Sequence, residues 1–596
     1  MKLSVLALDY DGTIAFHDVL DGSVRAAIGD ARTRGIKVLI VTGRSLDELR
    51  RVAGDLRLVD AVVAENGAVI HFPDTGHTTL LAPPIPQAFT AELERKGIPS
   101  RTGQCLVDAA AADAPRILDV IRATELPLVL AFNRSRVMVL PQGISKATGL
   151  QTTLEMMRVS PRNALAIGDA ENDHPLLSLA EVGAAVEWGS SRLKSEADLV
   201  IAGTEPTAIA AFLRPLLASG RLPPPGRARR RLLLGYGSDG REFSLAVRGR
   251  NILVTGDAKS GKSWIAGLLC EQLILYGYSV CVLDPEGDYR SLETLPGVTI
   301  LGGEDPPPTP RELCRALRFP DRSVVVDLSR LPHDEKIEYI HAALAALNAI
   351  RRSTGLPHRI VLDEAHYFLH DPGANQLLDL DLNGYTVVTY NASRLPPELL
   401  AKSEVILVTC ASDPAEIEAL RRCCSTCTPV DAERWSILGR LGPAQAVALP
   451  VTEETGGNLY PFTIGVRLTP HVRHREKYVD VPITESRAFV FANRGSGVRA
   501  RTIREFVDAL EHVDTAALTG HLRRGDLSRW IRDVFGDHAL ATDLAAYEAR
   551  AREGAGDLLP DILNAVRARY DLALDETSPL RAPAVEEGPT KEVAMH

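Results

Sequence analysis

Short runs of Val, Leu, Ile and Ala alternate with amphipathic stretches along the first 212 residues. This rhythm is typical of a parallel sheet whose strands are connected by helices. The segment over about 82–140 interrupts it, opens with Pro83-Pro84-Ile85-Pro86 and carries its own helix and strand patterns, which predicts an inserted cap. The hydrophobic runs predict strands at Ser4–Leu8, Lys37–Val41, Ala61–Ala64, Ala164–Ile167 and Asp198–Val200.

A second α/β pattern covers about 232–455. The segment before it, 213–231, is rich in proline and arginine, and we expect a stiffened, solvated linker. Residues 470–570 have an Arg/Glu-rich helical pattern, which predicts a mostly helical accessory module with a protein-docking role, and 571–596 is expected to be a disordered tail. The second block predicts strands at Asn251–Thr255, Ser279–Leu283, Ser323–Asp327, Arg359–Leu362, Thr386–Thr389 and Val405–Val408.

Composition is that of a globular protein without a membrane segment. No stretch approaches the ~18 continuous apolar residues of a membrane helix, and the run that begins at Met1 stops at Asp9 without a signal-peptide cleavage site. Eight cysteines are too few for a disulfide scaffold, so we expect a cytoplasmic protein. The net charge of −10 and 5% aromatic content argue against a general nucleic-acid coat, although a local basic groove stays open.

Two carboxylates, Asp9 and Asp11, directly follow the first predicted strand. Ligands bind at the carboxyl edge of an open parallel sheet, so both acids are expected there. We expect Asp9 to attack phosphorus and form an acyl phosphate, and Asp11 to protonate the leaving alkoxide. The backbone carbonyl of Asp11 and the carboxylate of Asp9 are also expected to hold a metal ion.

Three further pieces of sequence fit the same phosphoryl-transfer site. Thr42 ends the second strand and offers a hydroxyl and adjacent backbone amides to a phosphate oxygen. Lys146 supplies a cation for the anionic nucleophile. Asp169 and Asp173, four residues apart after another strand, are expected to hold Mg²⁺, which takes few protein ligands and keeps much of its water.

These four motifs together resemble the haloacid dehalogenase (HAD) superfamily of phosphatases. The spacing from Lys146 to Asp169 and the turn Glu65-Asn66-Gly67-Ala68 resemble its Cof-type, IIB-like branch, in which a cap lies between the second and third motifs. The length of the cap resembles that of the archaeal phosphoglycolate phosphatases and the sucrose-phosphate phosphatases. The resemblance implies a Rossmann-like parallel sheet with an inserted α/β cap and a Mg²⁺-dependent phosphatase that acts on a small phosphorylated metabolite.

The second block opens with Gly256-Asp257-Ala258-Lys259-Ser260-Gly261-Lys262-Ser263, which matches G-x-x-x-x-G-K-[ST] between a strand and a predicted helix at Trp264–Leu275. Gly256, Gly261 and their neighbours would cradle the phosphates of ATP, Lys262 would reach the β and γ oxygens, and Ser263 would ligate Mg²⁺. Asp363 and Glu364 end a later apolar strand. Asp363 is expected to hold Mg²⁺ through water, and Glu364 to polarise the attacking water.

This P-loop domain resembles the HerA/FtsK-type ATPases that pump DNA or protein. The resemblance rests on the P-loop together with the segments 284–289 and 389–396. It implies ATP binding and leaves a homo-oligomer through this domain open. Asn391 stands where the family has a sensor glutamine, the phosphatase stands where HerA proteins have a barrel, and Arg421 and Arg422 are the candidates for an arginine finger.

We therefore expect an α/β fusion of a HAD phosphatase, a P-loop NTPase domain that regulates it, and a small helical module. A rival interpretation is a nucleic-acid enzyme in which an ATP-driven translocase feeds ends to a phosphatase. DNA binding that weakens steeply with salt would separate the two. The cysteines at 423, 424 and 427 lack a zinc-like partner pair and are expected to be reduced thiols, and His471 and His474 are expected to lie in a solvated segment.

Overall fold

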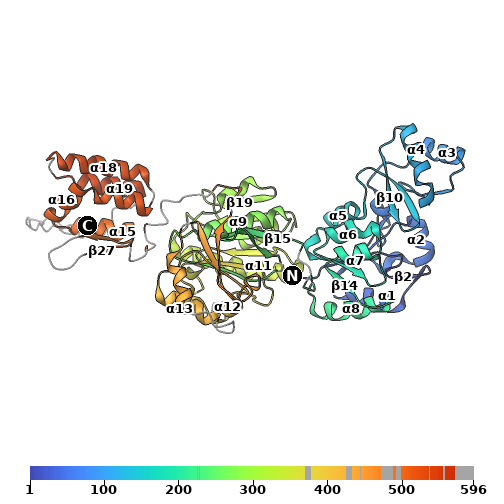
Figure 1. The fold of residues 1–596 in the computed structure, drawn as a ribbon, viewed down its shortest axis with the longest axis horizontal. Coiled ribbons are helices and arrows are strands. Elements are labelled where there is room, and N and C mark those ends of the chain that lie inside the picture. Colours follow the sequence, from blue (N-terminus) through green and yellow to red (C-terminus); the bar gives the residue numbers. More distant parts are fainter. Residues whose placement is uncertain are drawn as a thin grey trace, which may run out of the picture. The chain divides into compact units, whose positions relative to one another are not determined.

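The computed structural model describes residues 1–570 apart from 225, 227, 228, 248, 370–376, 425–431, 443, 471–478, 480–482, 484–486, 492–497, 536 and 555–556. The chain divides into two compact units, Met1–Arg473 and His474–His596. The first unit contains two large sheets, and the second contains a small hairpin with helices (Figure 1). Among the described helices, none has the length and the apolar content that a membrane crossing requires.

The first sheet contains eight strands in the order β14-β13-β12-β1-β4-β5-β6-β7. The strands from β14 to β5 run parallel, and β6 and β7 return as antiparallel neighbours. Their bounds are β1 Val5–Leu8, β4 Lys37–Val41, β5 Ala61–Ala64, β6 Val69–Phe72, β7 His77–Leu80, β12 Ala164–Gly168, β13 Val182–Val186 and β14 Leu199–Ile201.

Alternation along these strands fills both faces of the sheet. Leu6 and Leu8 of β1 belong to one apolar cluster, and Val5 and Ala7 belong to the other. Because successive side chains of a strand point to opposite faces, a strand that is buried on both faces reads as a continuous apolar run. The first cluster includes residues of α1 (Gly22–Thr33), α2 (Leu46–Ala53) and α8 (Thr207–Ser219), and the second includes residues of α5 (Lys146–Met157), α6 (His174–Leu179) and α7 (Ser191–Glu196).

A separate four-stranded antiparallel sheet forms the cap, in the order β10-β11-β9-β8. Its strands are β8 Ser100–Thr102, β9 Val107–Ala110, β10 Leu128–Asn133 and β11 Arg136–Pro141, and its helices are α3 Gln87–Arg95 and α4 Ala114–Thr124. Phe89 and Ile117 of the two helices share an apolar cluster with Val137 and Val139 of β11. The cap therefore has its own small core, as the interrupted pattern over 82–140 predicts.

The second sheet has eleven strands in the order β16-β15-β25-β24-β23-β17-β22-β21-β18-β20-β19. The strands from β23 to β19 are parallel, and the other four are antiparallel. The bounds are β15 Arg231–Gly237, β16 Glu242–Ala246, β17 Ile252–Thr255, β18 Val280–Asp284, β19 Val298–Gly302, β20 Ser323–Asp327, β21 Arg359–Leu362, β22 Tyr385–Thr389, β23 Val405–Val408, β24 Gln445–Ala448 and β25 Tyr460–Ile464.

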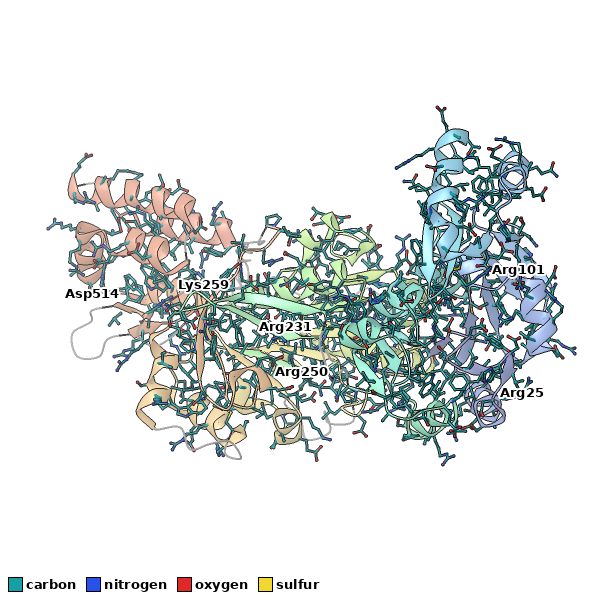
Figure 2. The ribbon with its side chains drawn as sticks, turned by 45° about the vertical axis from the view of Figure 1, so that its right-hand side comes forward. Arg25, Arg101, Arg231, Arg250, Lys259 and Asp514 are labelled. Atoms are coloured by element: carbon teal, nitrogen blue, oxygen red, sulfur yellow. The ribbon has the colours of Figure 1, made fainter. Side chains whose placement is uncertain are left out.

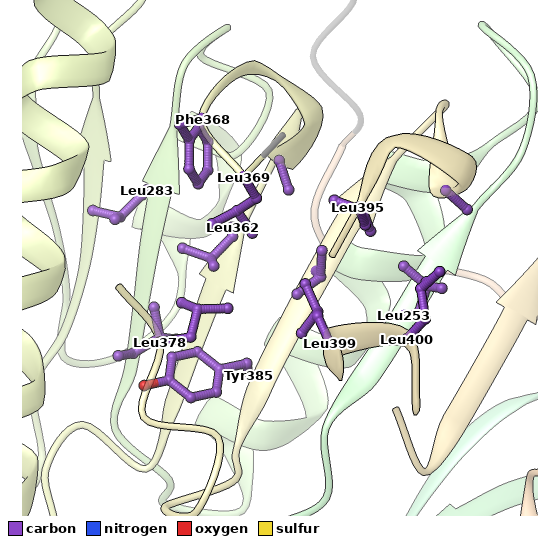
Figure 3. Close-up of a cluster of buried hydrophobic side chains, with 14 of the residues drawn as sticks. Leu253, Leu283, Leu362, Phe368, Leu369, Leu378, Tyr385, Leu395, Leu399 and Leu400 are labelled. Carbon is purple, nitrogen blue, oxygen red and sulfur yellow. The ribbon is translucent and has the colours of Figure 1, made fainter. Parts of the chain in front are cut away.

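Apolar layers cover this second sheet on both faces. On one face Leu253, Leu283 and Leu362 pack with Tyr385 and Leu399 (Figure 3). Arg250, labelled in Figure 2 in the segment before β17, forms a buried two-pronged ion pair with Glu454 at 2.7 and 3.1 Å. The helices of this part of the chain are α9 Lys262–Leu275, α10 Pro310–Ala316, α11 His333–Thr354, α12 Pro397–Ala401, α13 Pro414–Cys423 and α14 Ala432–Trp435.

The two sheets of the first unit meet at the amino ends of their strands. Asn163 precedes β12, and His358 precedes β21. The Ser279 N–H donates to His358 Nδ1 (2.8 Å), and His358 Nε2 lies 3.1 Å from Asn163 Oδ1. Since Nδ1 accepts, Nε2 carries the proton and the ring is neutral. Lys2 Nζ adds a 2.8 Å bond to the Ser353 carbonyl.

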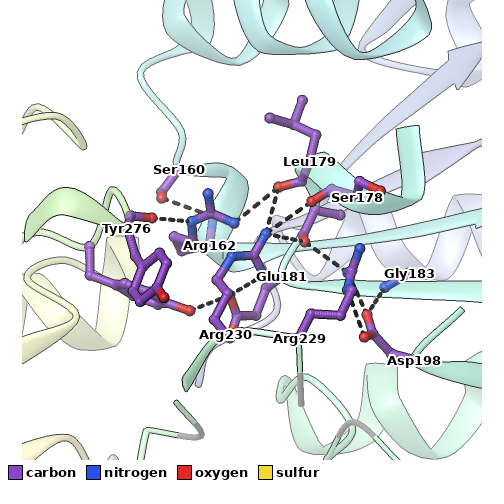
Figure 4. Close-up of polar contacts among 12 residues, drawn as sticks. Ser160, Arg162, Ser178, Leu179, Glu181, Gly183, Asp198, Arg229, Arg230 and Tyr276 are labelled. Carbon is purple, nitrogen blue, oxygen red and sulfur yellow. Dashed lines mark hydrogen bonds and ion pairs between the residues drawn. The ribbon is translucent and has the colours of Figure 1, made fainter. Parts of the chain in front are cut away.

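A second buried polar cluster belongs to the same junction. Tyr278 Oη donates to Glu181 Oε2 (2.8 Å), and Arg162 Nε donates to the Tyr276 carbonyl (3.0 Å) (Figure 4). Arg230 lies 3.5 Å from the same Glu181 oxygen. Burial raises the pKa of Glu181, while Arg230 and Tyr278 oppose that rise. Breaking one member of such a cluster leaves the other buried polar groups unsatisfied, so the junction resists separation.

Arginines of the proline-rich segment correct the expectation of a solvated linker. Arg229 pairs with Asp198 through both oxygens (2.7 and 2.5 Å), and Arg230 also donates to the carbonyls of Ser178 (3.0 Å) and Ala180 (3.2 Å). The segment is also shorter than expected, because 213–219 belong to α8. Composition alone cannot show that these arginines pair with the buried carboxylates of Asp198 and Glu181 in the folded chain.

The second unit has a hairpin of β26 (Phe489–Phe491) and β27 (Val498–Ala500) beside helices α15 Ile503–His512, α16 Thr515–Arg524, α17 Asp526–Trp530, α18 His538–Arg552 and α19 Leu559–Tyr570. Phe489, Phe506 and Trp530 form its aromatic core, with ring centroids 4.7 to 5.3 Å apart. The predicted tail 571–596 lies outside the described residues.

Candidate active site

Three carboxylates converge at the carboxyl ends of β1 and β12. Asp9 follows β1, Asp169 follows β12, and Asp173 ends the short 3-10 turn Glu171–Asp173. Because β1 and β12 are hydrogen-bonded neighbours, the first two acids emerge side by side. One carboxylate oxygen from each of the three lies within 4.8 Å of the others, and all three residues are buried.

Lys146, the first residue of α5, lies among these acids. Its Nζ is 2.5 Å from Asp9 Oδ1 and 2.6 Å from Asp173 Oδ1. Burial alone would lower the pKa of Lys146, but Asp173 and Asp9 outweigh it and hold that pKa above its usual value. Burial, together with Asp173, raises the pKa of Asp9, and burial also raises the pKa of Asp169. The Lys146 ammonium, even together with the Arg134 guanidinium at Asp169, leaves net negative charge on the three buried carboxylates, which a divalent cation would offset.

The donor set fits a hard cation. Asp9 and Asp169 offer carboxylate oxygens, and Thr13 Oγ1 lies 3.0 Å from one oxygen of each. Asp173 Oδ2 accepts the backbone N–H groups of Asp169 and Ala170, both at 3.0 Å, which holds the loop in place. Oxygen ligands of this kind are those that Mg²⁺ prefers. Sequence reasoning assigned no role to Thr13, although it stands in the Asp-x-Asp-Gly-Thr string.

Backbone and hydroxyl donors lie beside the carboxylates. Thr42 follows β4, is fully buried, and accepts the Arg44 N–H at 3.1 Å. Gly12 has φ +78°, and a Cβ built there would lie 2.6 Å from Asp169 Oδ2, so a side chain would displace the carboxylate. The loop after β1 therefore approaches Asp169 at a distance that only a glycine allows.

Asp11 lies outside the cluster of three carboxylates. Arg44 holds it in a two-pronged pair, with Nε to Oδ2 at 2.7 Å and Nη2 to Oδ1 at 2.6 Å, and also contacts Asp18. The Asp11 side chain is 41% exposed, so it faces the open side of the site. Its assignment as the proton donor stays a prediction. Sequence reasoning missed Arg44, although it directly follows the Thr42-Gly43 motif.

The cap contacts the same edge of the sheet at separate points. Glu65, in the turn after β5, accepts the N–H groups of Gln104 (2.9 Å) and Cys105 (2.7 Å) of the cap. A Cβ on Gly43 would lie 3.2 Å from the sulfur of Met138 in β11. These contacts place the cap over the carboxyl ends of β4 and β5.

The predicted P-loop lies at the carboxyl end of β17. Gly256 and Gly261 have φ values of +147° and +105°, and a Cβ on Gly256 would lie 2.4 Å from Thr409 Oγ1. Lys262 is buried and donates to the Asp257 carbonyl at 2.9 Å, and Ser263 Oγ donates to Asp288 Oδ2 at 2.8 Å. The structure thus brings the segment 284–289 to Ser263, the serine predicted to ligate Mg²⁺, a pairing that sequence reasoning did not predict.

The two acids after β21 are buried at the same edge of the second sheet. Asp363 is 0% and Glu364 1% exposed, and Glu364 has φ +46°. His366 Nδ1 lies 3.5 Å from a Glu364 oxygen and 3.3 Å from Thr389 Oγ1 at the end of β22. His366 therefore connects the predicted catalytic acid to the strand that precedes Asn391.

The remaining predicted residues have simple placements. The N–H of Asn391 donates to Thr389 Oγ1 at 3.1 Å, and Arg421 and Arg422 lie exposed on α13. Cys423 is half-buried and Cys424 is buried at the end of α13. Cys427, His471 and His474 lie outside the described residues.

Both sites lie far from the junction of the two sheets. Asp9 and Asp363 follow strands at their carboxyl ends, whereas Ser4 and His358 lie at the amino ends of the same strands. Five residues of strand span about 16 Å, so each site is separated from the junction by the full depth of its sheet. Among the described residues, no group of one site can contact a phosphate bound in the other.

Comparison with known proteins gives two families in sequence order. Residues 6–96 and 103–213 match the haloacid dehalogenase-like hydrolases, and residues 247–357 match the central domain of the helicase HerA. The first match contains Asp9, Thr42, Lys146 and Asp169. The second contains the P-loop and ends shortly before Asp363.

Curated relatives match the first part of the chain. A phosphoglycolate phosphatase of Natronomonas pharaonis is 32% identical over 206 residues, which is 33% of this chain and 89% of the relative. A phosphoglycolate phosphatase of Methanopyrus kandleri is 27% identical over 230 residues, 36% of this chain and 97% of the relative. Among solved structures, a phosphatase of the haloalkanoate superfamily from Bacteroides thetaiotaomicron is 23% identical with a TM-score of 0.31, covering 36% of this chain and 94% of its own.

Proposed function

The chain belongs to the haloacid dehalogenase-like hydrolases, and on that premise we propose that residues 1–212 hydrolyse a small phosphomonoester through a phosphoryl group carried on Asp9. The observation that carries this proposal is the buried cluster of Asp9, Lys146, Asp169 and Asp173 at the carboxyl edge of the first sheet. The cluster joins a nucleophile, a cation and two further acids within contact distance.

In the first half of the reaction, a carboxylate oxygen of Asp9 attacks phosphorus and the bond from phosphorus to the ester oxygen breaks. Asp11 donates a proton to the departing alkoxide, which leaves as the alcohol. Lys146 holds the attacking carboxylate in place and offsets its charge. The Thr42 hydroxyl and the neighbouring backbone N–H groups hold the phosphoryl oxygens as negative charge develops on them.

In the second half, water attacks the phosphorus of the acyl phosphate. Asp11, now ionised, accepts the proton of that water, the acyl–phosphate bond breaks, and Asp9 returns as a free carboxylate with inorganic phosphate as product. Arg44 pairs with Asp11 through both oxygens and so would keep it oriented between the two halves.

Magnesium is the cofactor we infer for this site. Asp9 and Asp169 would hold it directly with the Asp11 carbonyl, and Asp173 would support them through its bonds to Lys146 and the Asp169 N–H. When bound, Mg²⁺ neutralises charge on the phosphoryl oxygens. The substrate is a small phosphorylated metabolite, since the relatives named phosphoglycolate phosphatases align over nearly their whole length.

We further propose that the HerA-type domain binds and hydrolyses ATP and regulates the phosphatase. Gly256, Gly261 and Lys262 would hold the phosphates, Ser263 and Asp363 would hold a second Mg²⁺, and Glu364 would orient water. The buried polar junction supports this proposal, because packed groups rather than a loose tether would transmit a change in the second sheet to the first. Assembly through this domain stays a prediction, as does the cytoplasmic location.

The test is a matched set of carboxylate variants assayed on p-nitrophenyl phosphate with Mg²⁺. Asp9→Asn abolishes hydrolysis, because the amide cannot form the acyl phosphate. Asp11→Asn lowers kcat by about 10²–10⁴-fold, the range for proton transfer. Asp108→Asn, which changes a cap acid paired with Arg136, is the control and keeps full activity. Full activity of Asp9→Asn would overturn the proposal.

The nucleic-acid rival is tested on the same protein. The metabolic function requires no binding to duplex or single-stranded DNA, whereas a translocase that feeds ends to the phosphatase requires binding that weakens steeply with salt. Salt-sensitive DNA binding, together with removal of 3′-phosphates from oligonucleotides, would show that the substrate is a nucleic-acid end and not a small metabolite.

A further inference from the structure

An arginine of the cap reaches into the cluster of catalytic acids. Arg134 lies in the turn between β10 and β11 and has φ +52°. Its guanidinium contacts Asp169 Oδ2, and its backbone N–H lies 3.3 Å from Glu171 Oε2. The left-handed backbone at Arg134 closes the tight turn of the hairpin and fixes the direction in which its side chain leaves the cap. The hairpin thus directs a cation at the phosphoryl-transfer site.

The position of this guanidinium is on the substrate side of the site. A Cβ on Gly12 would lie 3.1 Å from Arg134 Nη2, so the guanidinium lies over the loop that carries Asp9 and Asp11. The Arg134 side chain is 58% exposed although its partner Asp169 is buried. Arg134 is therefore accessible from solvent while it contacts a buried acid.

Other arginines of the described cap do not share this role, because each pairs with an acid outside the cluster of Asp9, Asp169 and Asp173. Those pairs are Arg95 with Glu92, Arg101 with Glu48, Arg116 with Asp113, Arg122 with Asp119 and Arg136 with Asp108. Arg136 is two residues from Arg134 on the same hairpin, yet its guanidinium pairs with Asp108 of β9.

The charges around Arg134 indicate that its guanidinium needs a new anionic partner during turnover. In the proposed function Asp169 shares its charge with Mg²⁺, so Arg134 loses much of its partner's attraction when the metal binds. The phosphoryl group already has Lys146 and the donors around Thr42. An anionic group elsewhere on the substrate would give Arg134 a new partner, and a planar guanidinium matches a carboxylate through two parallel bonds.

We propose that Arg134 binds a carboxylate of the substrate, so that the site selects phosphomonoesters of short hydroxy acids. Only two side-chain groups, the Asp169 carboxylate and the Thr13 hydroxyl, lie between the Arg134 guanidinium and the Asp9 carboxylate. Thr13 Oγ1 lies 3.0 Å from an oxygen of Asp169 and 3.0 Å from an oxygen of Asp9. Phosphorus and the carboxylate of the substrate are therefore separated by a short carbon chain. This inference rests on the proposed phosphatase function and adds the class of substrate.

The experiment compares two substrates of equal length, phosphoglycolate and 2-hydroxyethyl phosphate, on the full chain with Mg²⁺. We expect kcat/KM to favour phosphoglycolate by about 10- to 100-fold, the effect of one charged hydrogen-bonded pair. Arg134→Gln reduces that ratio to near 1 through a higher KM for phosphoglycolate, and Arg134→Lys keeps part of it. Arg136→Gln is the matched control and leaves the ratio unchanged.

The outcomes separate the two proposals. Equal use of both substrates by the unaltered protein, or a ratio that survives in Arg134→Gln, overturns the role of Arg134 while hydrolysis itself supports the phosphatase. Failure to hydrolyse either ester or p-nitrophenyl phosphate overturns the phosphatase. If Arg134→Gln does not fold, Arg134→Lys decides, because a ratio equal to that of the unaltered protein contradicts the two-pronged contact.

Discussion

Acid should weaken the junction between the two sheets through His358. The ring is fully buried, accepts the Ser279 N–H and lies 3.1 Å from Asn163 Oδ1. Burial lowers its pKa to about 3, and Arg162, Arg351 and the amino terminus act in the same direction. Protonation would add a third positive charge to those of Arg162 and Arg351 and remove the acceptor of the Ser279 bond.

The magnitude follows from the difference between the folded and unfolded pKa values. An unfolded chain protonates histidine near pH 6.5, so between about pH 6.5 and 3 the unfolded state binds a proton that the folded state does not. Stability from this group is therefore complete above pH 6.5 and is lost as the pH falls. At 1.36 kcal/mol per pH unit, the loss is about 2 kcal/mol at pH 5 and at most about 5 kcal/mol at pH 3.

The assay is urea unfolding of the full chain at pH 7.5 and at pH 5, with His358→Gln as the test variant. Gln keeps the bond to Asn163 but has no group that titrates in this range. At pH 7.5 we expect the variant to be about 1 kcal/mol less stable, because the Ser279 bond is lost. Between pH 7.5 and 5 the unaltered protein should lose about 2 kcal/mol more than the variant.

The control is His77→Gln, which changes an exposed histidine of β7. It should follow the unaltered protein at both pH values, because an exposed side chain has similar surroundings in the folded and unfolded states. If the curves of the unaltered protein and His358→Gln fall in parallel from pH 7.5 to 5, the neutral buried ring does not stabilise the junction and our reasoning is refuted.

Three further predictions concern the other charged groups. Lys262→Ala should abolish ATP binding and keep the basal phosphatase rate, whereas Glu364→Gln should bind ATP without turning it over. If ATP regulates the phosphatase, a coupling of 1–3 kcal/mol should change the phosphatase rate of the unaltered protein by roughly 5- to 150-fold when ATP is added. Lys262→Ala should show no such change. Arg467→Met should destabilise the P-loop domain by about 3–5 kcal/mol in urea unfolding, because it strands Glu271 in a pair whose side chains are 0% and 1% exposed; the double variant Arg467→Met, Glu271→Leu should recover most of that loss. Arg134→Gln should strengthen Mg²⁺ binding in calorimetry without substrate, because a competing cation leaves Asp169; weaker binding would contradict the proposed competition.

Most of the parallel strands were predictable because they are buried on both faces. The predicted strands Lys37–Val41, Ala61–Ala64, Ser323–Asp327, Arg359–Leu362 and Val405–Val408 are confirmed to the residue. Antiparallel edge strands such as Glu242–Ala246 were missed, because one face is exposed and the run of apolar residues is broken. Val182–Val186 was missed because it is built of small residues, and a Cβ on Gly183 would lie 2.7 Å from Leu177.

The residues of the candidate site were predictable where they stand in local sequence motifs, and were missed where they come from elements distant in the sequence. Asp9, Thr42, Lys146 and Asp169 stand in local motifs at strand and helix ends, so their convergence follows from the order of the strands. Pairs between elements distant in sequence carry no local signal. The contact of Arg134 with Asp169 joins the cap to the first sheet and could be seen only in three dimensions.

The most direct test of the account is to locate the phosphoryl group during turnover. If Asp11 accepts the proton of the attacking water as proposed, Asp11→Asn should slow hydrolysis of the acyl phosphate. A rapid acid quench of this variant with phosphoglycolate and Mg²⁺ should then capture the covalent enzyme for peptide mapping by mass spectrometry. We predict one phosphoryl group, on the peptide that contains Asp9, and none after Asp9→Asn is added to the same chain. Release of phosphate with no phosphoryl group on that peptide, or with the group on another residue, would contradict the central claim.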